Sequence, residues 1–364
     1  MNIPPCKPVF TKEMEEAAVN ALRNEKYILG ESVAKFEEDF AKYCNIGHAV
    51  SVSSGTNALH LALLAADVKP KDEIVTVASS YIATSNSVLH ANAIPVFCDI
   101  NDSYLIDVQQ IEKKIKKKTK GIIPVDLYGN PADMDEINAI AQKKKLFVIE
   151  DCAQSHGAIY KGKKTGSLTD ISCFSFYSTK NMTVCGDGGM VTTNNEKIAK
   201  TVELLRNHGQ HPKDVHTILG YTARLNTVNA AIGRVQLKYL EEWIDARRRV
   251  AKKYFDLLKD VEEIVLPPGD IKGKKPSFHL FEITTEKRDD LMNFLKQNGI
   301  ITLIHYPTPI PNQPLYKELF HYKEGMFPKS EVLSKQAMDL PMFPELKDDE
   351  ITFISEKIHE FFNR

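Results

Sequence analysis

The sequence predicts an α/β protein in which a large domain with a mainly parallel sheet is followed by a smaller α+β domain. Two observations support this fold class. The first two-thirds of the chain alternate short apolar runs with helical patterns, and the apolar runs read as strands buried on both faces. A stretch rich in Pro and Gly at 266–276 then breaks the pattern, and elements in a different arrangement follow it.

Seven apolar segments in the first two-thirds read as strands, which indicates a seven-stranded type of sheet. They lie at 49–52, 73–77, 95–100, 121–129, 146–151, 171–177 and 189–193. Helical patterns follow three of them, at 58–66, 85–93 and 133–145. Pro124 lies inside the fourth segment and weakens that prediction, because proline cannot donate a hydrogen bond to a neighbouring strand.

The last third of the chain has a different order of elements. A helical stretch at 228–258 is long enough to connect two domains. We place the boundary within it, so that residues 1–245 form the large domain and residues 246–364 the small one. Beyond the break, strands are expected at 278–285 and 301–306, and helices at 288–300, 331–340 and 351–362.

Bulk properties give no sign of several kinds of partner. The 364 residues carry 47 basic and 48 acidic side chains, and a net charge of −1 gives no reason to expect nucleic acid or an anionic membrane. No apolar stretch approaches the ~20 residues that span a bilayer, and the N-terminus lacks a signal-peptide pattern. Six scattered cysteines without a C-x-x-C pair indicate reduced thiols and no zinc site. We therefore expect a cytoplasmic protein without a metal.

The first chemical feature is the turn Ser53-Ser54-Gly55, which joins a strand to a helix. Ligands of open α/β sheets bind at the carboxyl ends of the strands. The free N–H groups at a helix start attract anions, and Gly55 lets a phosphate approach the backbone closely. An ordinary capped helix has the same pattern, so this turn alone does not decide between the two interpretations.

The second feature is a pair of acids, Glu150 and Asp151, directly after an apolar strand. A buried acid is costly unless it has a partner, and a carboxylate at a strand tip is suited to neutralise a protonated ring nitrogen. The alternative is a solvated strand end in which Asp151 caps a turn. The nearby His156 reads as structural, because no second metal ligand lies at helical spacing from it.

The third feature is Lys180, which follows an aromatic-rich strand and precedes the turn Gly-Asp-Gly-Gly at 186–189. A lysine confined there is desolvated, which lowers its pKa and makes it a nucleophile toward carbonyl groups. Alone, it would read as a surface charge. Together the three features match what pyridoxal phosphate requires, namely a phosphate site, an acidic partner for the ring nitrogen and a lysine for the Schiff base.

The order of these motifs resembles the DegT/DnrJ/EryC1/StrS family of sugar aminotransferases. The resemblance runs over nearly the whole chain and includes SSGTNALHLAL, EDCAQSHGA, SFYSTKNMTVCGDGGMVTT, ARLNTVNAAIGRVQLKYLE and GIITLIHYPTPIPNQPLY. It implies the fold-type-I architecture with pyridoxal 5'-phosphate as the cofactor. It also implies a ping-pong transfer of an amino group from glutamate or glutamine to a nucleotide-linked keto-deoxy sugar.

The resemblance implies a role for each residue that matches a family motif. Lys180 carries the Schiff base, and Asp151 keeps the pyridine nitrogen protonated. Tyr81 stacks on the ring, Ala153 covers its opposite face, and Gln154 lies near its phenolic oxygen. The phosphate is held by Gly55, Thr56 and Ser175. The candidates for binding substrate are Arg224, His305 and Tyr306.

The resemblance also implies a homodimer, because a second subunit completes the sites of this family. The segment from His208 to Arg224 is expected to reach the neighbouring site. Two positions depart from the family pattern. Thr222 replaces a common Asn that contacts the neighbouring subunit's phosphate, and Pro311 replaces a common His at the border of the substrate site.

Three alternatives to this function stay open. The acceptor could be a keto-cyclitol in place of a nucleotide-linked sugar. The enzyme could instead catalyse β-elimination or desulfuration, with Cys152 or Cys185 as a nucleophile. A non-catalytic protein that senses the cofactor or a sugar is the third alternative. Lys180 argues against the dehydratases of the family, in which His replaces this lysine.

Overall fold

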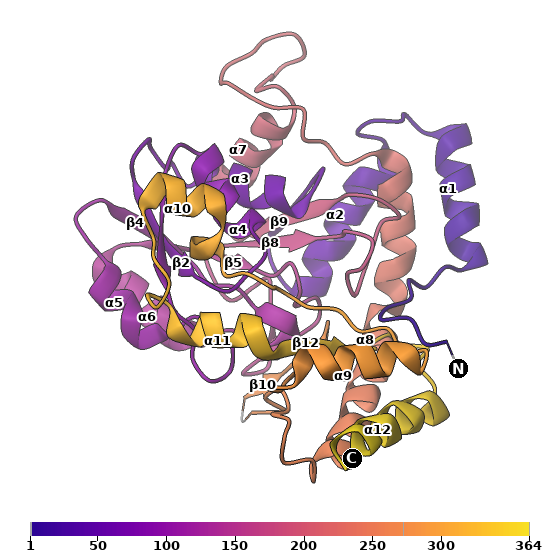
Figure 1. Cartoon of the computed structure of the whole chain (residues 1–364). Coiled ribbons are helices and arrows are strands. Elements are labelled where there is room, and N and C mark those ends of the chain that lie inside the picture. Colours follow the sequence, from indigo (N-terminus) through magenta and orange to yellow (C-terminus); the bar gives the residue numbers. More distant parts are fainter. Residues whose placement is uncertain (1, 272, 364) are drawn as a thin grey trace.

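The computed structural model describes residues 2–271 and 273–363, and a seven-stranded sheet lies at its centre (Figure 1). The strand order is β1-β9-β8-β5-β4-β2-β3. Only β9 runs antiparallel to its neighbours β1 and β8, so the predicted mainly parallel α/β fold is confirmed. The strands of this sheet are β1 (His48–Val52), β2 (Glu73–Val77), β3 (Ile94–Cys98), β4 (Thr119–Ile123), β5 (Phe147–Asp151), β8 (Ile171–Ser175) and β9 (Gly189–Thr193).

Helices cover both faces of this sheet, because successive residues of the strands, which point to opposite faces, are buried. In β2, Ile74 packs with residues of α3, α4 and α7, whereas Val75 packs with residues of α5 and α6 on the other face. The helices around the sheet are α2 (Glu31–Cys44), α3 (Gly55–Ala65), α4 (Ala83–His90), α5 (Val108–Lys114), α6 (Met134–Lys144) and α7 (Glu196–Arg206). Because helices cover both faces of the sheet, the carboxyl edge of its strands is the part that remains open to ligands.

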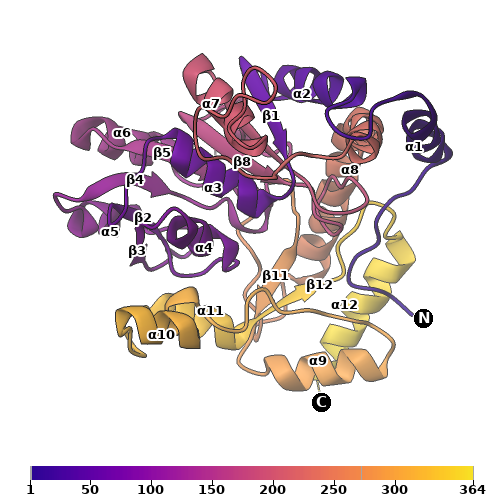
Figure 2. The ribbon, with the colours of Figure 1, turned by 90° about the horizontal axis from the view of Figure 1, so that it is seen from above.

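Helix α8 (Thr227–Leu258) connects the sheet to a second hydrophobic core (Figure 2). Its first half packs against α1 (Lys12–Asn24) and α2. Its second half presents Val250 and Tyr254 to a core formed around β11 (Phe281–Thr284), β12 (Ala337–Leu340), α9 (Arg288–Gln297) and α12 (Asp348–Phe362). The helix is continuous through residue 245, and the domain boundary there stays a prediction.

Two expected elements of the C-terminal part are wrong. The segment 331–340 was expected to be one helix, but α11 (Pro328–Gln336) ends early and the remaining residues form β12, which pairs with β11. This long-range pairing overrides the local helical pattern. The segment 301–306 was expected to be a strand, but only Leu303 makes a bridge, to Asp339. The prolines that follow cannot extend a ladder.

Other boundaries differ by a few residues. Strand β4 ends at Ile123, directly before Pro124, and a 3-10 turn at Leu127–Gly129 follows.

Near the C-terminus, two short helices, α10 (Pro314–Phe320) and α11, pack against the β3 edge of the sheet (Figure 2). One three-stranded sheet elsewhere consists of β6 (Ile159–Tyr160), β7 (Lys163–Lys164) and β10 (Lys274–Lys275), and a further 3-10 turn lies at Ile310–Asn312. No helix within residues 2–271 and 273–363 is long and apolar enough to cross a membrane.

Candidate active site

A cavity of about 380 Å³ opens at the carboxyl edge of the sheet, where β1, β5 and β8 end. Every residue predicted to contact the cofactor lines it, and so do two of the three substrate candidates. The predicted residues in its wall are Gly55, Thr56, Tyr81, Asp151, Ala153, Gln154, Ser175, Lys180, His305 and Tyr306. Residues from five separate segments of the sequence therefore meet at one place. Four of the segments follow strands of the large sheet, as its arrangement predicts, and the fifth, with His305 and Tyr306, comes from the C-terminal part.

Lys180 lies in the loop after β8 and lines the cavity together with Asp151. The surrounding protein excludes water, and this desolvation lowers the pKa of Lys180 to about 8, although the charge of Asp151 acts in the opposite direction. The side chain is only partly covered because the cavity itself leaves one side open. A lysine of this kind holds far more neutral, nucleophilic amine near neutral pH than an ordinary lysine does.

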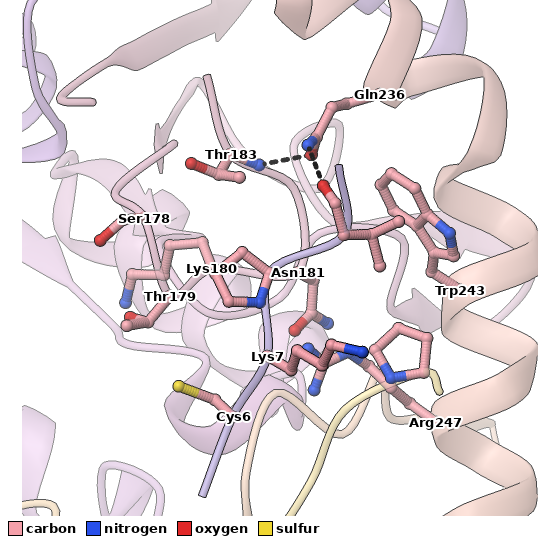
Figure 3. A pocket seen from close by; sticks show the side chains of 13 residues that line it. Cys6, Lys7, Ser178, Thr179, Lys180, Asn181, Thr183, Gln236, Trp243 and Arg247 are labelled. Atoms are coloured by element: carbon pink, nitrogen blue, oxygen red, sulfur yellow. Dashed lines mark hydrogen bonds between the residues drawn. The ribbon is translucent and has the colours of Figure 1, made fainter. Parts of the chain in front are cut away.

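Residues of α8 and of the N-terminal segment lie beside the loop that carries Lys180 (Figure 3). Gln236 of α8 accepts a hydrogen bond of 2.9 Å from the backbone N–H of Thr183. Arg247 of the same helix lies behind the loop and donates to carbonyl groups of the segment before β11. Cys6 of the N-terminal segment closes this side (Figure 3). The loop with the lysine is therefore tied to α8 through Gln236.

Asp151 is the last residue of β5 and is buried at 4% exposure. Burial raises the pKa of its carboxyl group, and three contacts lower it in part. These are hydrogen bonds from the hydroxyl of Thr84 at 2.8 Å and the backbone N–H of Ala153 at 3.1 Å, and the charge of Lys180. A carboxylate held in this way is suited to stabilise a positive charge inside the cavity.

The neighbouring acid, Glu150, points away from the cavity, because successive strand residues face opposite sides of a sheet. One of its oxygens accepts hydrogen bonds from the Gly166 N–H at 3.0 Å and the Ser172 hydroxyl at 2.8 Å. It lies beside the buried Asp126, and burial raises the pKa of both carboxyl groups. Of the two adjacent acids Glu150 and Asp151, it is therefore Asp151 that is available for cofactor chemistry.

The start of α3 forms a cradle at one end of the cavity. Within the described residues, the backbone N–H groups of Gly55 and Thr56 have no acceptor, so they can bind an anion. A Cβ atom on Gly55 would lie 2.7 Å from the Cβ atom of Ser175, so a larger residue would close this end. Ser54 caps the helix by accepting from the N–H of Asn57 at 3.1 Å.

Aromatic and amide groups form the opposite wall. The rings of Tyr81 and Tyr306 are 5.6 Å apart between centroids, and Tyr81 is 57% exposed, so its face is free for a ligand. Gln154 donates to the hydroxyl of Tyr306 at 3.1 Å and accepts from the backbone N–H of Tyr128 at 2.6 Å. This amide is therefore held in one orientation by contacts on both of its ends.

Arg224 is the one predicted site residue that does not line the cavity. It lies in the segment between α7 and α8, which extends away from the rest of the chain (Figure 1). Its guanidinium donates to Asn207 at 2.9 Å. In the same segment, Thr222 contacts the ring of His208 at 3.0 Å, and the nearby Leu219 is 84% exposed.

Sequence reasoning missed His279, which also lines the cavity. Its Nδ1 atom is 3.1 Å from Oδ1 of Asn181, the residue after Lys180. Burial, and next the charges of Lys180 and Arg247, lower the pKa of His279 well below its usual range, so the imidazole is neutral. Thr84 was missed as well. Both residues become recognisable only when the fold brings them to Lys180 and Asp151.

The cavity fits pyridoxal phosphate. The free N–H groups at the start of α3 suit the phosphate, and the space that a side chain at position 55 would fill is kept open. Asp151 suits the ring nitrogen, and Lys180 lies within the same walls with a lowered pKa.

Comparison with known proteins agrees with this geometry. The profile of the DegT/DnrJ/EryC1/StrS aminotransferase family matches residues 8–359. This chain belongs to that family. It is 42% identical over 358 residues to the "pleiotropic regulatory protein" of Geobacillus stearothermophilus, covering 98% of this chain and 95% of the relative. It is 36% identical over 353 residues to dTDP-3-amino-3,4,6-trideoxy-alpha-D-glucose transaminase of Streptomyces venezuelae, covering 97% and 93%.

Solved structures of this family share the fold over nearly the whole chain. DesV of S. venezuelae, solved in complex with a ketimine intermediate, has a TM-score of 0.94 and 36% identity, and the match covers 97% of this chain and 95% of DesV. The sugar aminotransferase Spr1654 of Streptococcus pneumoniae, described as putative and solved in its PLP-form, has a TM-score of 0.95 at 26% identity and covers 100% and 99%. The fold-type-I architecture expected from the sequence is confirmed.

Proposed function

We propose that this protein is a pyridoxal-phosphate-dependent aminotransferase that moves an amino group from glutamate or glutamine to a nucleotide-linked keto-deoxy sugar by a ping-pong mechanism. The observation that carries the proposal is the meeting of Lys180 and Asp151 in one cavity, with the cradle of α3 at its end. Family membership supports the enzyme class and the cofactor. Relatives that act on dTDP-, UDP- and GDP-linked sugars support the acceptor class.

The cofactor supplies a carbonyl group that captures the amine and a ring that accepts the electrons released at the substrate carbon. The protein supplies the proton transfers and the fixed charges. With the cofactor bound, the amine of Lys180 would take and return the proton of the substrate carbon, for which it must be neutral, and its lowered pKa favours that state. Asp151 would stabilise positive charge on the ring, and the hydrogen bond from Thr84 favours the ionised form of this carboxyl group.

A second subunit completes the site in this proposal. The segment between α7 and α8 projects from the chain and exposes Val215, Ile218 and Leu219, which suits a surface that is covered in a homodimer (Figure 1). Arg224 lies in the same segment and would act in the neighbouring cavity. The six cysteines are free in the structure, in keeping with work in the cytoplasm.

The test begins with borohydride reduction of the protein mixed with pyridoxal phosphate, followed by peptide mass spectrometry. The cofactor mass is expected on Lys180, and a Lys180→Ala variant should stay colourless. Labelling of another lysine would refute the assignment. Product mass spectrometry with glutamate and a panel of dTDP-, UDP- and GDP-linked keto-deoxy sugars, with keto-inositols alongside, then identifies the acceptor. Turnover of keto-inositols alone would favour the cyclitol alternative.

A regulatory protein is the second candidate function, because one relative is named a pleiotropic regulatory protein and another a sensory transduction protein. A non-catalytic sensor needs the cofactor pocket but no proton-transfer group. The lowered pKa of Lys180 and the hydrogen-bonded Asp151 favour catalysis. Bound cofactor without conversion by any amino donor would support the sensor.

A further inference from the structure

Two buried acids face each other in the sheet of β11 and β12. Glu282 and Asp339 are direct partners in this antiparallel pair, so their side chains stand on the same face. The two residues are 0% and 2% exposed. Neither has a role in the proton transfers described above. Buried acids are rare unless they are paired or protonated, so this pair requires an explanation.

The carboxyl oxygens of Glu282 and Asp339 outnumber the hydrogen-bond donors around them. One oxygen of Asp339 accepts from Nδ1 of His305. The other oxygen of Asp339 and both oxygens of Glu282 are buried without a partner in the part of the chain that the structure describes. Burying acceptors without donors is costly. A proton on Glu282 removes much of this deficit, because it lets one carboxyl group donate to the other.

The surroundings of Glu282 favour the protonated form of its carboxyl group. Burial first, and then the charge of Asp339, raise the pKa of Glu282 well above its usual range, and the charge of Arg288 offsets this only in part. The guanidinium of Arg288 is already engaged by an exposed acid and a backbone carbonyl. Tyr104 and Tyr128 approach from the large sheet, and burial raises the pKa of both hydroxyls, so they add no charge.

The pair of Glu282 and Asp339 is connected to the cavity through His305. His305 lines the cavity beside Tyr306, and its side chain is 28% exposed. Because Nδ1 is bound to Asp339, Nε2 is the ring nitrogen left for a ligand. The backbone of His305 is held too, since its carbonyl accepts from the hydroxyl of Tyr128. His305 is therefore held at both its imidazole ring and its backbone carbonyl.

We propose that Glu282 is a positioning residue for the acceptor: as a neutral acid it donates to Asp339, which holds His305 with its free ring nitrogen toward the sugar nucleotide. The proposal rests on the proposed function, because it takes this cavity as the acceptor site. The ring nitrogen then binds a hydroxyl or phosphate oxygen of the acceptor. Lys180 and Asp151 lie on other elements and make no hydrogen bond with Glu282 in the described part of the chain, so we expect the reaction with the amino donor to change little when Glu282 is replaced.

The first experiment needs no substrate. Nitrogen-15 NMR of labelled histidines in the holoenzyme, with His305 assigned from a His305→Gln variant, reports the proton on Nδ1. That proton is expected to be protected from exchange in the wild type and in Glu282→Gln, whose amide can also donate to Asp339. It should be lost in Glu282→Leu and in Asp339→Leu, which has no acceptor for Nδ1. Loss in Glu282→Gln, or retention in Asp339→Leu, would overturn the proposal even if Glu282→Leu does not fold.

The second experiment measures function with whichever sugar of the acceptor panel turns over. Glu282→Leu should raise KM for that acceptor about tenfold, which corresponds to about 1.4 kcal/mol, and leave the rate of the glutamate half-reaction within about twofold. The exposed Glu286→Leu is the matched control and should change neither. In a His305→Gln background, Glu282→Leu should have no further effect, whereas additive effects would mean a merely structural role. If no sugar reacts, the proposed function fails and the NMR result still decides the role of Glu282.

Discussion

The hydroxyl of Thr84 donates a hydrogen bond of 2.8 Å to the carboxylate of Asp151, and both groups are buried at the edge of the cavity. Since its single proton goes to Asp151, Thr84 accepts from the hydroxyl of Ser80 at 2.9 Å. The two hydroxyls form a chain that ends on the acid. This chain favours the ionised form of Asp151 against the cost of its burial.

Thr84→Val should therefore slow amino transfer. Without the hydroxyl, the pKa of Asp151 rises further, and the acid neutralises the cofactor ring less well. A hydrogen bond to a charged group contributes about 1.5–3 kcal/mol, so a loss of roughly 10- to 100-fold in the glutamate half-reaction is expected. Stopped-flow absorbance of the cofactor measures this rate. Thr84→Ser keeps the hydroxyl and serves as the control, and equal rates in the two variants would contradict the role.

The pKa of Lys180 predicts how the apoenzyme captures its cofactor. The neutral amine is the nucleophile, so the rate of Schiff-base formation with pyridoxal phosphate should rise with pH through about 8 and level off above it. Asp151 raises the pKa of Lys180, so Asp151→Asn should move the midpoint to lower pH. Absorbance after rapid mixing gives the profile. A rate that still climbs above pH 10 would show that Lys180 is not desolvated.

Gly55→Ala should weaken cofactor binding. The added Cβ atom would lie 2.7 Å from the Cβ atom and 3.2 Å from the Cα atom of Ser175, so the cradle must open or the helix start must shift. Overpacking of this kind costs about 1–3 kcal/mol, which corresponds to a rise in Kd of roughly 5- to 150-fold. Gly269→Ala, whose Cβ would meet only the ring of Phe255 at 3.6 Å, is the control. Fluorescence titration of the apoenzyme measures both.

Two adjacent glutamates of α2 should differ strongly in their effect on stability. Glu37 lies against the buried Arg206, which also donates to the carbonyl of Ser51 at 2.7 Å. Glu37→Ala leaves this guanidinium without its counter-charge and should lower the free energy of unfolding by about 3–5 kcal/mol.

Glu38→Ala provides the matched control for this stability prediction. Glu38 pairs with Lys42 at 2.7 Å on the exposed face of the same helix, and such pairs contribute about 0–1 kcal/mol. Urea denaturation of the apoenzyme compares the two variants directly. Similar losses for both would mean that burial of the Arg206 pair does not matter to the fold.

The large sheet could be predicted from the sequence because its strands are apolar on both faces, and residues such as Ile74 and Val75 are adjacent and both buried. The site could be predicted for the same reason, since Asp151 and Lys180 are polar groups next to such strands. The small sheet could not. Its strand β12 follows α11 without a break and is stabilised by β11, which lies more than fifty residues earlier in the chain.

The supporting residues escaped prediction for a related reason. Thr84, His279 and Glu282 are ordinary residues in sequence, and nothing in their neighbours marks them. Each gains its meaning from one distant contact: Thr84 with Asp151, and His279 with Asn181. Such contacts follow from the path of the chain between elements, which local patterns do not encode.

Helix α8 contains 32 residues and is therefore about 48 Å long, and it contributes side chains to both hydrophobic cores. Along this one helix, Gln236 binds the loop that carries Lys180, and Arg247 binds the carbonyl groups of Phe278 and Met342, on either side of the small sheet. A substitution that bends α8 between these two residues would therefore shift the small sheet, with Asp339 and Glu282, relative to Lys180.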